Sequence, residues 1–389
     1  MYDTIRVFIE SDSAVEKRIS GIGYSTISIL EELNKVASRD PRLEIISIVP
    51  DTNVLPLELK RLKNIKYKKM PGPYKYMNYL LTKLKFGLPA DLIFGKGLYI
   101  FPNFKNWKLA FSSSITFIHD LAYINHPNTV EQNNIRYLQS NLGKWLRRTT
   151  KIACISEATK RDLVRQYKDI NSKTEVIYLG VDTQKYKIIN KAKTEKATSK
   201  YGLPSSYILF VGNIEPRKNL ETLLTAYENL YINDSKIPPL AVVGGNGWLN
   251  ESILANIKRM QNKGIPVYRN NRYVSNKDMP SIFSAAILLI HPAIYEGFGL
   301  PILQAMACGT PVICSDTSSM PEVGGKAVEY FNPHSHKELE EKIRLVLSSK
   351  EKQGRMIEAG LERSTRLTWS NVVIRILETG DIKHIDIVK

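Results

Sequence analysis

Short runs of β-branched and aliphatic residues alternate with helical patterns along the whole chain of 389 residues. This alternation is typical of βαβ units, which build parallel sheets covered by helices on both faces. The sequence therefore predicts an α/β protein whose ligands bind at the carboxyl ends of its strands. The expected strands are Ile5–Ile9, Leu43–Val49, Ile115–Ile118, Lys151–Ile155, Glu175–Tyr178, Tyr207–Val211, Leu240–Val243, Ile287–Ile290 and Pro311–Cys314.

The length of the chain and one polar segment predict two domains. Residues 187–203 begin with KIINKAKTEKATSK, which is rich in lysine and has no strand pattern, so we expect a linker there. The linker divides a Rossmann-like domain at 1–186 from a second one at 204–368. A further helix is expected in the final segment, about 369–389.

The chain carries 55 Lys and Arg against 38 Asp and Glu, a formal charge of +17, while 43% of it is hydrophobic. That hydrophobic fraction argues against a disordered chain. The charge is uneven, because residues 1–190 hold 30 basic and 18 acidic side chains, a net of +12. The two halves are therefore expected to differ electrostatically.

Three cysteines, Cys154, Cys308 and Cys314, are widely spaced in apolar sequence. This pattern argues against a disulfide framework and a metal cluster, and it favours a reducing compartment. Residues 1–10 contain three charged side chains, which a signal peptide core would not, and no apolar run has the length of a membrane span. We expect a soluble or peripheral protein.

A basic and aromatic stretch, residues 60–108, contains twelve basic residues and one acid, Asp91, interleaved with ten aromatic residues. Such a mixture suits an anionic membrane surface, where cations meet headgroups and aromatics settle at their level. Nucleic acid would use the same residues, although no known nucleic-acid module accompanies them. The remaining alternative is a solvated basic face over ordinary core aromatics.

The first glycine loop, Gly21-Ile22-Gly23, lacks the third glycine of a dinucleotide fingerprint and lies about ten residues beyond the first strand. It argues against a dehydrogenase. The glycines precede a helical pattern whose N-terminal amides would suit an anion, or would let a sugar approach the backbone. A plain glycine turn into a helix explains them equally well.

Arg217 and Lys218 lie between an expected strand, Tyr207–Val211, and a helical pattern from Leu220 to Leu230. Two cations at the carboxyl end of a strand, beside a helix N-terminus, suit a diphosphate. A surface Arg-Lys pair without a ligand is the alternative.

The most informative segment is HPAIYEGFGLPILQAMACGTPVI, residues 291–313. Pro301 stands where a first helical residue would. Gly297 and Gly299 leave the backbone bare ahead of that helix, so a phosphate would meet its amides while Glu296 faces a sugar hydroxyl.

This segment resembles the signature of the retaining glycosyltransferases of family 4, which have the GT-B fold of two Rossmann-like domains facing a cleft. The resemblance covers nearly the whole chain. It extends to Ser20–Tyr24, His119-Asp120, Cys154–Arg161, Val176–Asp182, Glu215–Asn219 and Arg272–Phe283.

The resemblance implies that Arg217 and Lys218 hold the donor diphosphate and that Glu296 contacts the hydroxyls of the transferred sugar. It also implies that the final helix packs back on the first domain. Further implied contacts are a phosphate at Gly297, Phe298, Gly299 and Leu300, the base at Tyr273 and Val274, and the anomeric centre near His119, which would otherwise be a core histidine.

Two positions depart from the family pattern. Gln304 stands where a second Glu usually binds the ribose diol, and an amide has one acceptor oxygen where a carboxylate has two. A deoxyribose needs no such bidentate acceptor, so we expect a deoxythymidine diphosphate sugar, with dTDP-rhamnose the best candidate. Asn213 stands where many members have arginine, which leaves Arg217 to supply that charge.

The expected activity is retaining transfer of a hexose or deoxyhexose to a glycan or lipid-linked acceptor in surface polysaccharide synthesis. The absence of an Asp-x-Asp pair suggests that neither a metal nor another cofactor is needed. The protein would act in the cytoplasm at the inner face of the membrane, without nucleic acid. Alternatives are a mannosyl- or glucosyltransferase using GDP- or UDP-sugars, a sugar-nucleotide epimerase of the same fold, and a basic nucleic-acid-binding protein.

Overall fold

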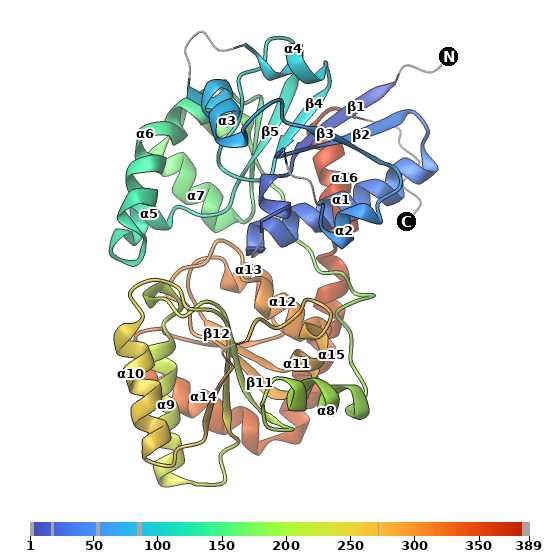
Figure 1. The fold of residues 1–389 in the computed structure, drawn as a ribbon. Helices are drawn as coiled ribbons and strands as arrows, with labels where there is room; N and C mark the ends of the chain where they lie inside the picture. Colours follow the sequence, from blue (N-terminus) through green and yellow to red (C-terminus); the bar gives the residue numbers. More distant parts are fainter. Residues whose placement is uncertain (1–3, 17–18, 52–54, 84–87, 271, 383–389) are drawn as a thin grey trace. The chain divides into compact units, whose positions relative to one another are not determined.

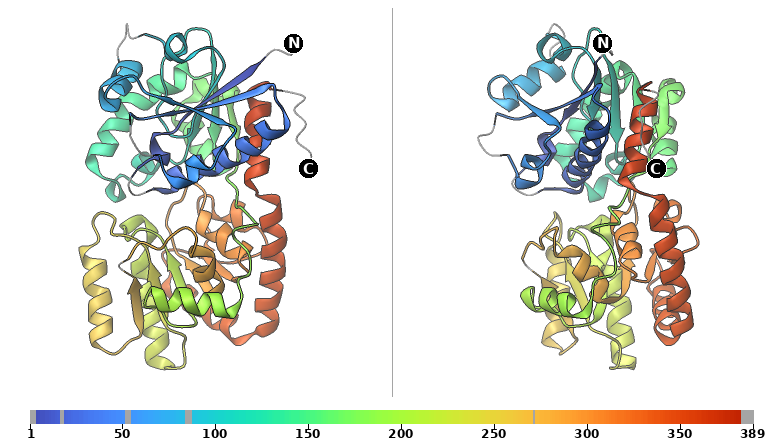
Figure 2. Two further views of the ribbon diagram at one scale, coloured as in Figure 1. Left: turned by 45° about the vertical axis from the view of Figure 1, so that its right-hand side comes forward. Right: turned by 90° about the vertical axis from the view of Figure 1, so that its right-hand side faces the viewer.

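The structure, a computed structural model, describes residues 4–16, 19–51, 55–83, 88–270 and 272–382. It divides into two compact units. Each unit contains one parallel sheet with helices on both faces (Figures 1 and 2). The N-terminal unit comprises Met1–Asp120, Arg136–Leu179 and Trp369–Lys389, and the C-terminal unit comprises Leu121–Ile135 and Gly180–Thr368.

The sheet of the N-terminal unit has seven strands in the order β3-β2-β1-β4-β5-β6-β7, and every pair is parallel. Its central strands are buried on both faces, as their aliphatic runs predict. The strands are β1 (Ile5–Glu10), β2 (Leu43–Val49), β3 (Ile65–Lys69), β4 (Leu98–Phe101), β5 (Ser113–Ile118), β6 (Lys151–Cys154) and β7 (Thr174–Val176).

Helix α16, from Trp369 to Thr379, belongs to the N-terminal unit and packs against α1. Its apolar face is buried, and Thr379 donates a hydrogen bond of 3.0 Å to Glu175. The helices of residues 1–179 are α1 (Gly21–Arg39), α2 (Leu57–Lys60), α3 (Tyr74–Lys83), α4 (Ala90–Phe94), α5 (Ala122–Asn125), α6 (Gln132–Arg148) and α7 (Glu157–Gln166), of which α5 groups with the C-terminal unit.

Four aromatic side chains of the stretch 60–108 lie in the core of the N-terminal unit, those of Phe94, Tyr99, Phe101 and Trp107. Trp107 is buried against Phe94 and Phe101, with ring centroids 5.9 and 5.4 Å apart. Tyr76 and Tyr79 on α3 are exposed. The alternative of core aromatics under a basic surface therefore describes much of this stretch.

The sheet of the C-terminal unit has six strands in the order β10-β9-β8-β11-β12-β13, again all parallel. The strands are β8 (Tyr207–Val211), β9 (Leu240–Val243), β10 (Val267–Asn270), β11 (Ala286–His291), β12 (Val312–Ser315) and β13 (Glu329–Phe331). The helices are α8 (Lys191–Lys200), α9 (Leu220–Asn233), α10 (Glu251–Asn262), α11 (Met279–Ala285), α12 (Leu300–Ala307), α13 (Met320–Gly324), α14 (His336–Ser348) and α15 (Lys350–Arg366).

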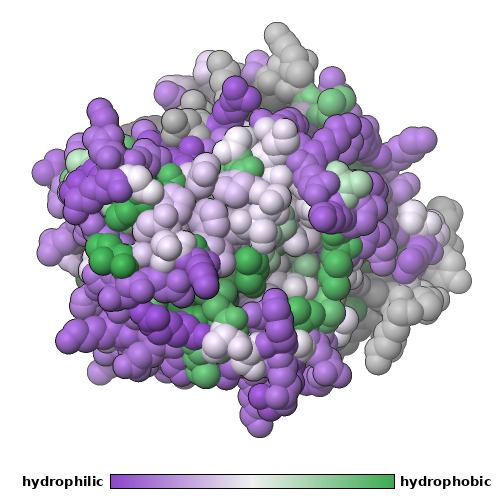
Figure 3. Space-filling view, turned by 90° about the horizontal axis from the view of Figure 1, so that it is seen from below, coloured by the Kyte–Doolittle hydropathy of each residue, from purple (hydrophilic) through white to green (hydrophobic). Residues whose placement is uncertain are grey.

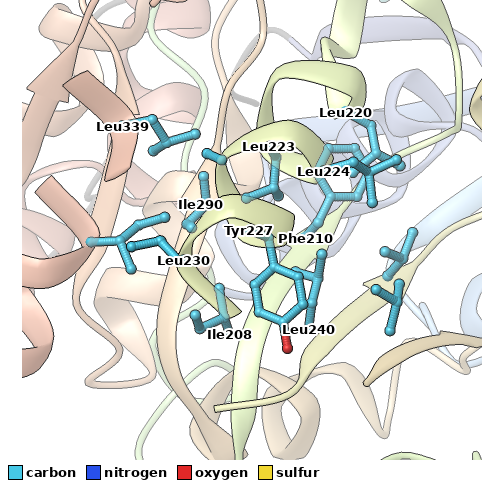
Figure 4. Packing of buried hydrophobic residues seen from close by; sticks show 14 of the residues in the cluster. Ile208, Phe210, Leu220, Leu223, Leu224, Tyr227, Leu230, Leu240, Ile290 and Leu339 are labelled. Carbon is cyan, nitrogen blue, oxygen red and sulfur yellow. The ribbon is translucent and has the colours of Figure 1, made fainter. Parts of the chain in front are cut away.

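Helix α9 packs its apolar face on the sheet of the C-terminal unit (Figure 4). Leu220, Leu223 and Tyr227 are fully buried against strand residues that include Phe210. Full burial of each such side chain contributes about 1.5 to 3 kcal/mol. The Tyr227 hydroxyl also donates to the Pro238 carbonyl at 3.1 Å. This packing fixes the start of α9, and with it the loop that follows β8.

The structure differs from the predicted boundaries in two places. Residues 187–203, expected to be a linker, contain helix α8, which packs against α11 in the C-terminal unit. Tyr201 after this helix donates to Asp278 at 2.7 Å. Residues 121–135, expected in the first domain, also group with the C-terminal unit. Helix α8 buries only small residues, such as Ala197, so its sequence is nearly all polar.

The surface is mostly hydrophilic on the face that Figure 3 shows, with apolar and weakly polar side chains gathered in its middle. Scattered apolar surface of this kind is normal for a folded protein in water. Within the described ranges, none of the helices has the length and apolar character that crossing a bilayer requires.

Candidate active site

The sheet order of the C-terminal unit places a topological switch point between β8 and β11. From β8 the chain leads to β9 on one side, and from β11 it leads to β12 on the other. In open parallel sheets, ligands bind outside the carboxyl ends of the strands at such a point. Here the two loops that leave it are residues 212–219 and 292–299. They contain Arg217, Lys218 and Glu296.

Hydrogen bonds join these two loops. The Ile294 amide donates to the Arg217 carbonyl at 3.0 Å. Asn219, which has a left-handed backbone with φ of 54°, donates from its side chain to the carbonyls of Pro292 and Pro333 at 3.0 and 2.8 Å. The loops are therefore held against each other without help from a ligand.

A third loop fixes the backbone of Glu296. The hydroxyls of Ser318 and Ser319 both donate to the Glu296 carbonyl, the second at 2.8 Å. Gly299 then adopts φ of +97° as the residue before α12, and Pro301 lies in the first turn of that helix. The predicted glycine and proline positions are thus the ones that this turn requires.

The three predicted charged side chains form one buried cluster. Arg217 Nη1 lies 3.2 Å from Glu296 Oε2, and Lys218 Nζ donates to Glu296 Oε1. The side chains of Glu296, Arg217 and Lys218 are 10, 12 and 15% exposed. Arg217 also donates to Glu215 at 2.8 Å and to the Tyr295 carbonyl at 2.8 Å. Two cations are therefore balanced by two carboxylates.

The electrostatics of the cluster favour an ionised Glu296. Burial alone would raise the pKa of Glu296, but Lys218 and Arg217 hold it well below its ordinary value. Burial raises the pKa of Glu215, although Arg217 opposes that shift. The cations therefore act mainly on Glu296.

His291, the last residue of β11, is a member of the cluster that the sequence did not single out. Its Nε2 lies 3.2 Å from Glu296 Oε1, and the side chain is 1% exposed. Burial lowers the pKa of His291, which favours the neutral ring. Glu215 was missed in the same way, because neither residue's contact with the cluster is visible from spacing. The position of each at the end of a strand or in the adjoining loop was the available signal.

The other residues predicted to bind the donor differ in how far they are exposed. Gly297, Phe298 and Gly299 are buried and Leu300 is partly buried at the start of α12, where Gln304 lies one turn further on. Asn213 and Tyr273 are exposed, and Val274 is buried. Among the described residues, no group of three or more His, Cys, Asp or Glu side chains is arranged to hold a metal ion.

The other predicted site residues lie in the N-terminal unit. His119 follows β5 and is largely buried, with Nε2 at 2.6 Å from the Pro102 carbonyl. Burial lowers the pKa of His119. Gly21 and Gly23 form the first turn of α1, and a Cβ at Gly23 would lie 2.3 Å from the Ser13 carbonyl oxygen. Close packing therefore explains Gly23.

Two family models match the sequence. One is described as "Glycosyl transferases group 1" and matches residues 192–363. The other is described as "Glycosyltransferase Family 4" and matches residues 36–185. Together the matches span most of both units.

Individual proteins are similar as well. The O-antigen chain mannosyltransferase B of Escherichia coli is 29% identical over 259 residues, which are 66% of this chain and 67% of that protein. The serotype-specific mannosyltransferase WbdA of Escherichia coli is 25% identical over 272 residues, which are 68% of this chain and 33% of that protein. This chain thus matches about a third of the length of WbdA. The crystal structure of Anabaena HepE in complex with UDP-glucose has a TM-score of 0.69 at 15% identity, over 96% of this chain and 99% of that chain.

Proposed function

The chain belongs to glycosyltransferase family 4 and has the GT-B fold, and on that premise we propose that it transfers mannose from a nucleoside diphosphate sugar to a surface polysaccharide. The observation that carries the proposal is the buried cluster of Arg217, Lys218 and Glu296 at the switch point of the C-terminal unit. The similarity to O-antigen mannosyltransferases supports mannose and polysaccharide.

The cluster suits the donor because Arg217 and Lys218 already contact the same carboxylate, that of Glu296. A diphosphate would bind Arg217 and Lys218 together with amides at the start of α12. The diphosphate would then balance the charges of Arg217 and Lys218 in place of Glu296. The Glu296 carboxylate would accept hydrogen bonds from sugar hydroxyls. Loss of the diphosphate from the anomeric carbon puts negative charge on these groups, so the cations would stabilise the transition state.

We propose retention of configuration, with the acceptor hydroxyl attacking from the face that the diphosphate leaves. The bond from the anomeric carbon to the phosphate oxygen breaks, a bond to the acceptor oxygen forms, and the acceptor's proton goes to the leaving phosphate. His119 remains a proposed neighbour of the anomeric centre. We propose that Arg217 and Lys218 supply the charge that a metal or other cofactor would otherwise bring.

The base of the donor is the finer question. The mannosyltransferase relatives favour a mannose donor, for which we propose GDP-mannose. Gln304 instead favours dTDP-rhamnose, because an amide offers a single acceptor oxygen to a ribose diol. Tyr273 and Val274 are the proposed neighbours of the base. We rank GDP-mannose first and dTDP-rhamnose second.

Thermal stabilisation by GDP, dTDP, UDP and ADP tests the donor, with and without magnesium. A ligand that binds only the folded state raises Tm. A GDP preference supports mannose, a dTDP preference supports the Gln304 argument, and equal shifts with and without magnesium support metal independence. No shift with any nucleotide would contradict the donor site. Product analysis without an acceptor distinguishes an epimerase, which would convert the nucleotide sugar itself.

We also propose that the protein acts in the cytoplasm on the inner face of the membrane, through a patch beside α4. Leu88, Leu92 and Phe111 are each more than half exposed, and the Phe111 amide is tied to Asp91 of α4 at 2.7 Å. Lys96 Nζ lies 4.6 Å from the centre of the Phe111 ring. Apolar side chains among cations match an anionic bilayer, to which each cation contributes about 1 kcal/mol.

Vesicles with and without anionic lipid test this patch. Leu92→Ser together with Phe111→Ser should lower partitioning onto anionic vesicles at least tenfold, because partial burial of each side chain contributes about 1 kcal/mol or more. Lys66→Glu, Lys68→Glu and Lys69→Glu should lower it further. Ile232→Ser is the control, since Ile232 is as exposed but lies in the C-terminal unit. Binding that is absent in the wild type or insensitive to salt would reject the patch.

A further inference from the structure

His291 ends strand β11 with its ring buried beside the carboxylate of Glu296. The side chain is 1% exposed, and Nε2 lies 3.2 Å from Glu296 Oε1. Among the residues that the structure describes, however, neither ring nitrogen has a hydrogen-bond partner of ordinary geometry. A buried polar group without a partner costs free energy, and native proteins keep few of them. The ring of His291 therefore calls for an explanation in function.

Two cations hold the same carboxylate and act on the ring as well. Lys218 Nζ donates to Oε1, the oxygen nearest to His291, and Arg217 Nη1 lies 3.2 Å from Oε2. Burial lowers the pKa of His291, and Glu296 acts to raise it. Lys218 and Arg217 act to lower it. The neutral ring is therefore favoured while both cations contact Glu296.

A diphosphate donor changes this balance, because its phosphates bring negative charge to Arg217 and Lys218. Both cations have long side chains that can turn toward a ligand. Glu296 and His291 are held more firmly, since two serine hydroxyls donate to the Glu296 carbonyl and His291 belongs to a central strand. Once the phosphates neutralise the cations, the ionised Glu296 remains beside His291 and favours a proton on the ring.

The four elements that pack most closely on β11, all of them described in full, are β8, β12, α11 and α12. Tyr207 and Cys314 are their titratable residues, and burial raises the pKa of each. Both therefore stay neutral and take up no proton at about pH 7. Burial also raises the pKa of Glu215, while its contact with Arg217 at 2.8 Å opposes that shift. Glu215 is thus the competing site for a proton, at a carboxylate rather than at the ring of His291.

We infer that His291 takes up a proton from solvent when the donor binds, and that the imidazolium then holds the Glu296 carboxylate in place for the transferred sugar. The inference rests on the proposed donor site. Nε2 makes a charge-assisted hydrogen bond to Glu296, which is stronger than one from a neutral ring, and Nδ1 lacks a partner in both forms. His291 is a positioning residue, because it acts on the sugar through Glu296. Donor binding and pH are thereby coupled.

Calorimetric titration of the full chain with the intact nucleotide sugar, in buffers that differ in ionisation enthalpy, measures the uptake. The nucleotide sugar that contains the base chosen by the thermal panel is used. A nucleoside diphosphate is avoided, since its terminal phosphate has a pKa of about 6 and exchanges protons itself. The wild type should take up as much as one proton per donor at about pH 7. Its Kd should rise up to about tenfold per pH unit between about pH 6 and pH 8, because the ring must be protonated in the complex.

Two variants separate the proton from the hydrogen bond. His291→Gln keeps an N–H group close to the place of Nε2 but does not titrate, so proton uptake should disappear while most of the transfer rate remains. His291→Phe fills the space without an N–H group, and should lower kcat about tenfold or more with a smaller change in KM for the donor. His334→Gln is the control, since His334 is an exposed histidine of the same unit and should leave the uptake unchanged.

Three results would overturn the inference. One is a wild type that binds the nucleotide sugar without proton uptake, a measurement that needs no variant to fold. The second is undiminished uptake in His291→Gln, which would assign the proton to Glu296 or Glu215. The third is a wild-type kcat in His291→Phe. A wild type that binds none of the nucleotide sugars would instead reject the donor site, and the inference with it.

Discussion

Replacing Glu296 by Gln removes the charge that holds two buried cations and keeps the shape of the side chain. Loss of one partner from a buried ion pair costs about 3 to 5 kcal/mol. Arg217 keeps its contact with Glu215 at 2.8 Å, so we expect the lower value, about 3 kcal/mol. For a domain of this size, that corresponds to a decrease in Tm of about 6 to 12 °C.

The same substitution should strengthen binding of the nucleoside diphosphate. In the free protein, Glu296 competes with the diphosphate for Arg217 and Lys218. A unit charge about 6 Å away is worth about 3 kcal/mol at an effective dielectric constant of about 20. Rearrangement of Arg217 and Lys218 in the variant offsets part of this gain. About 1.4 kcal/mol remains, which corresponds to a tenfold lower Kd for the nucleoside diphosphate. Transfer should nevertheless be lost, because Gln does not replace the carboxylate toward sugar hydroxyls.

Differential scanning fluorimetry and calorimetric titration measure the two effects on one preparation. The expected pattern is a lower Tm without ligand, a larger Tm shift with nucleoside diphosphate, and a transfer rate reduced at least a hundredfold. Weaker nucleotide binding in Glu296→Gln, or an unchanged Tm without ligand, would refute the argument that Glu296 is the internal counter-ion. Normal transfer would refute its role toward the sugar.

Four further results are expected. Arg217→Ala and Lys218→Ala should each raise Kd for nucleoside diphosphate ten- to a hundredfold by titration, since a charge-assisted hydrogen bond contributes about 1.5 to 3 kcal/mol; unchanged affinity in both would contradict the phosphate assignment. The pKa of Glu296 is lowered in the folded protein, so its carboxylate contributes fully to the free energy of unfolding above pH 4.5, the ordinary pKa of a Glu side chain. This contribution is lost as the pH falls below that value. Acid unfolding should therefore show a component that is missing in Glu296→Gln. Gly244→Ala should destabilise by more than about 3 kcal/mol in urea unfolding, because its Cβ would lie 1.8 Å from the Gly212 carbonyl oxygen. Gly354→Ala, in open space within α15, should stabilise by about 0.5 to 1 kcal/mol.

The strands that sequence reasoning found and missed differ in their place in the sheet. All nine expected strands are present. Eight of them have neighbours on both sides, where a strand is typically aliphatic on both faces, and the ninth, β7, is an edge. The missed strands β3, β10 and β13 are edges of their sheets. β3 reads IKYKK and exposes its lysines, as edge strands often do. The missed central strand β4, LYIF, was hidden by the aromatic residues around it.

The residues of the donor cluster could be predicted because they lie in two local motifs, each next to a strand end. Their ion pairing could not be predicted, because Arg217 and Glu296 meet only through the order of β8 and β11 in the sheet. His291 and Glu215 were missed for the same reason.

The charges of the donor cluster are balanced before a donor binds. The C-terminal unit balances its cations with carboxylates before any donor arrives, so binding a diphosphate exchanges one counter-ion for another and leaves no buried charge unpaired.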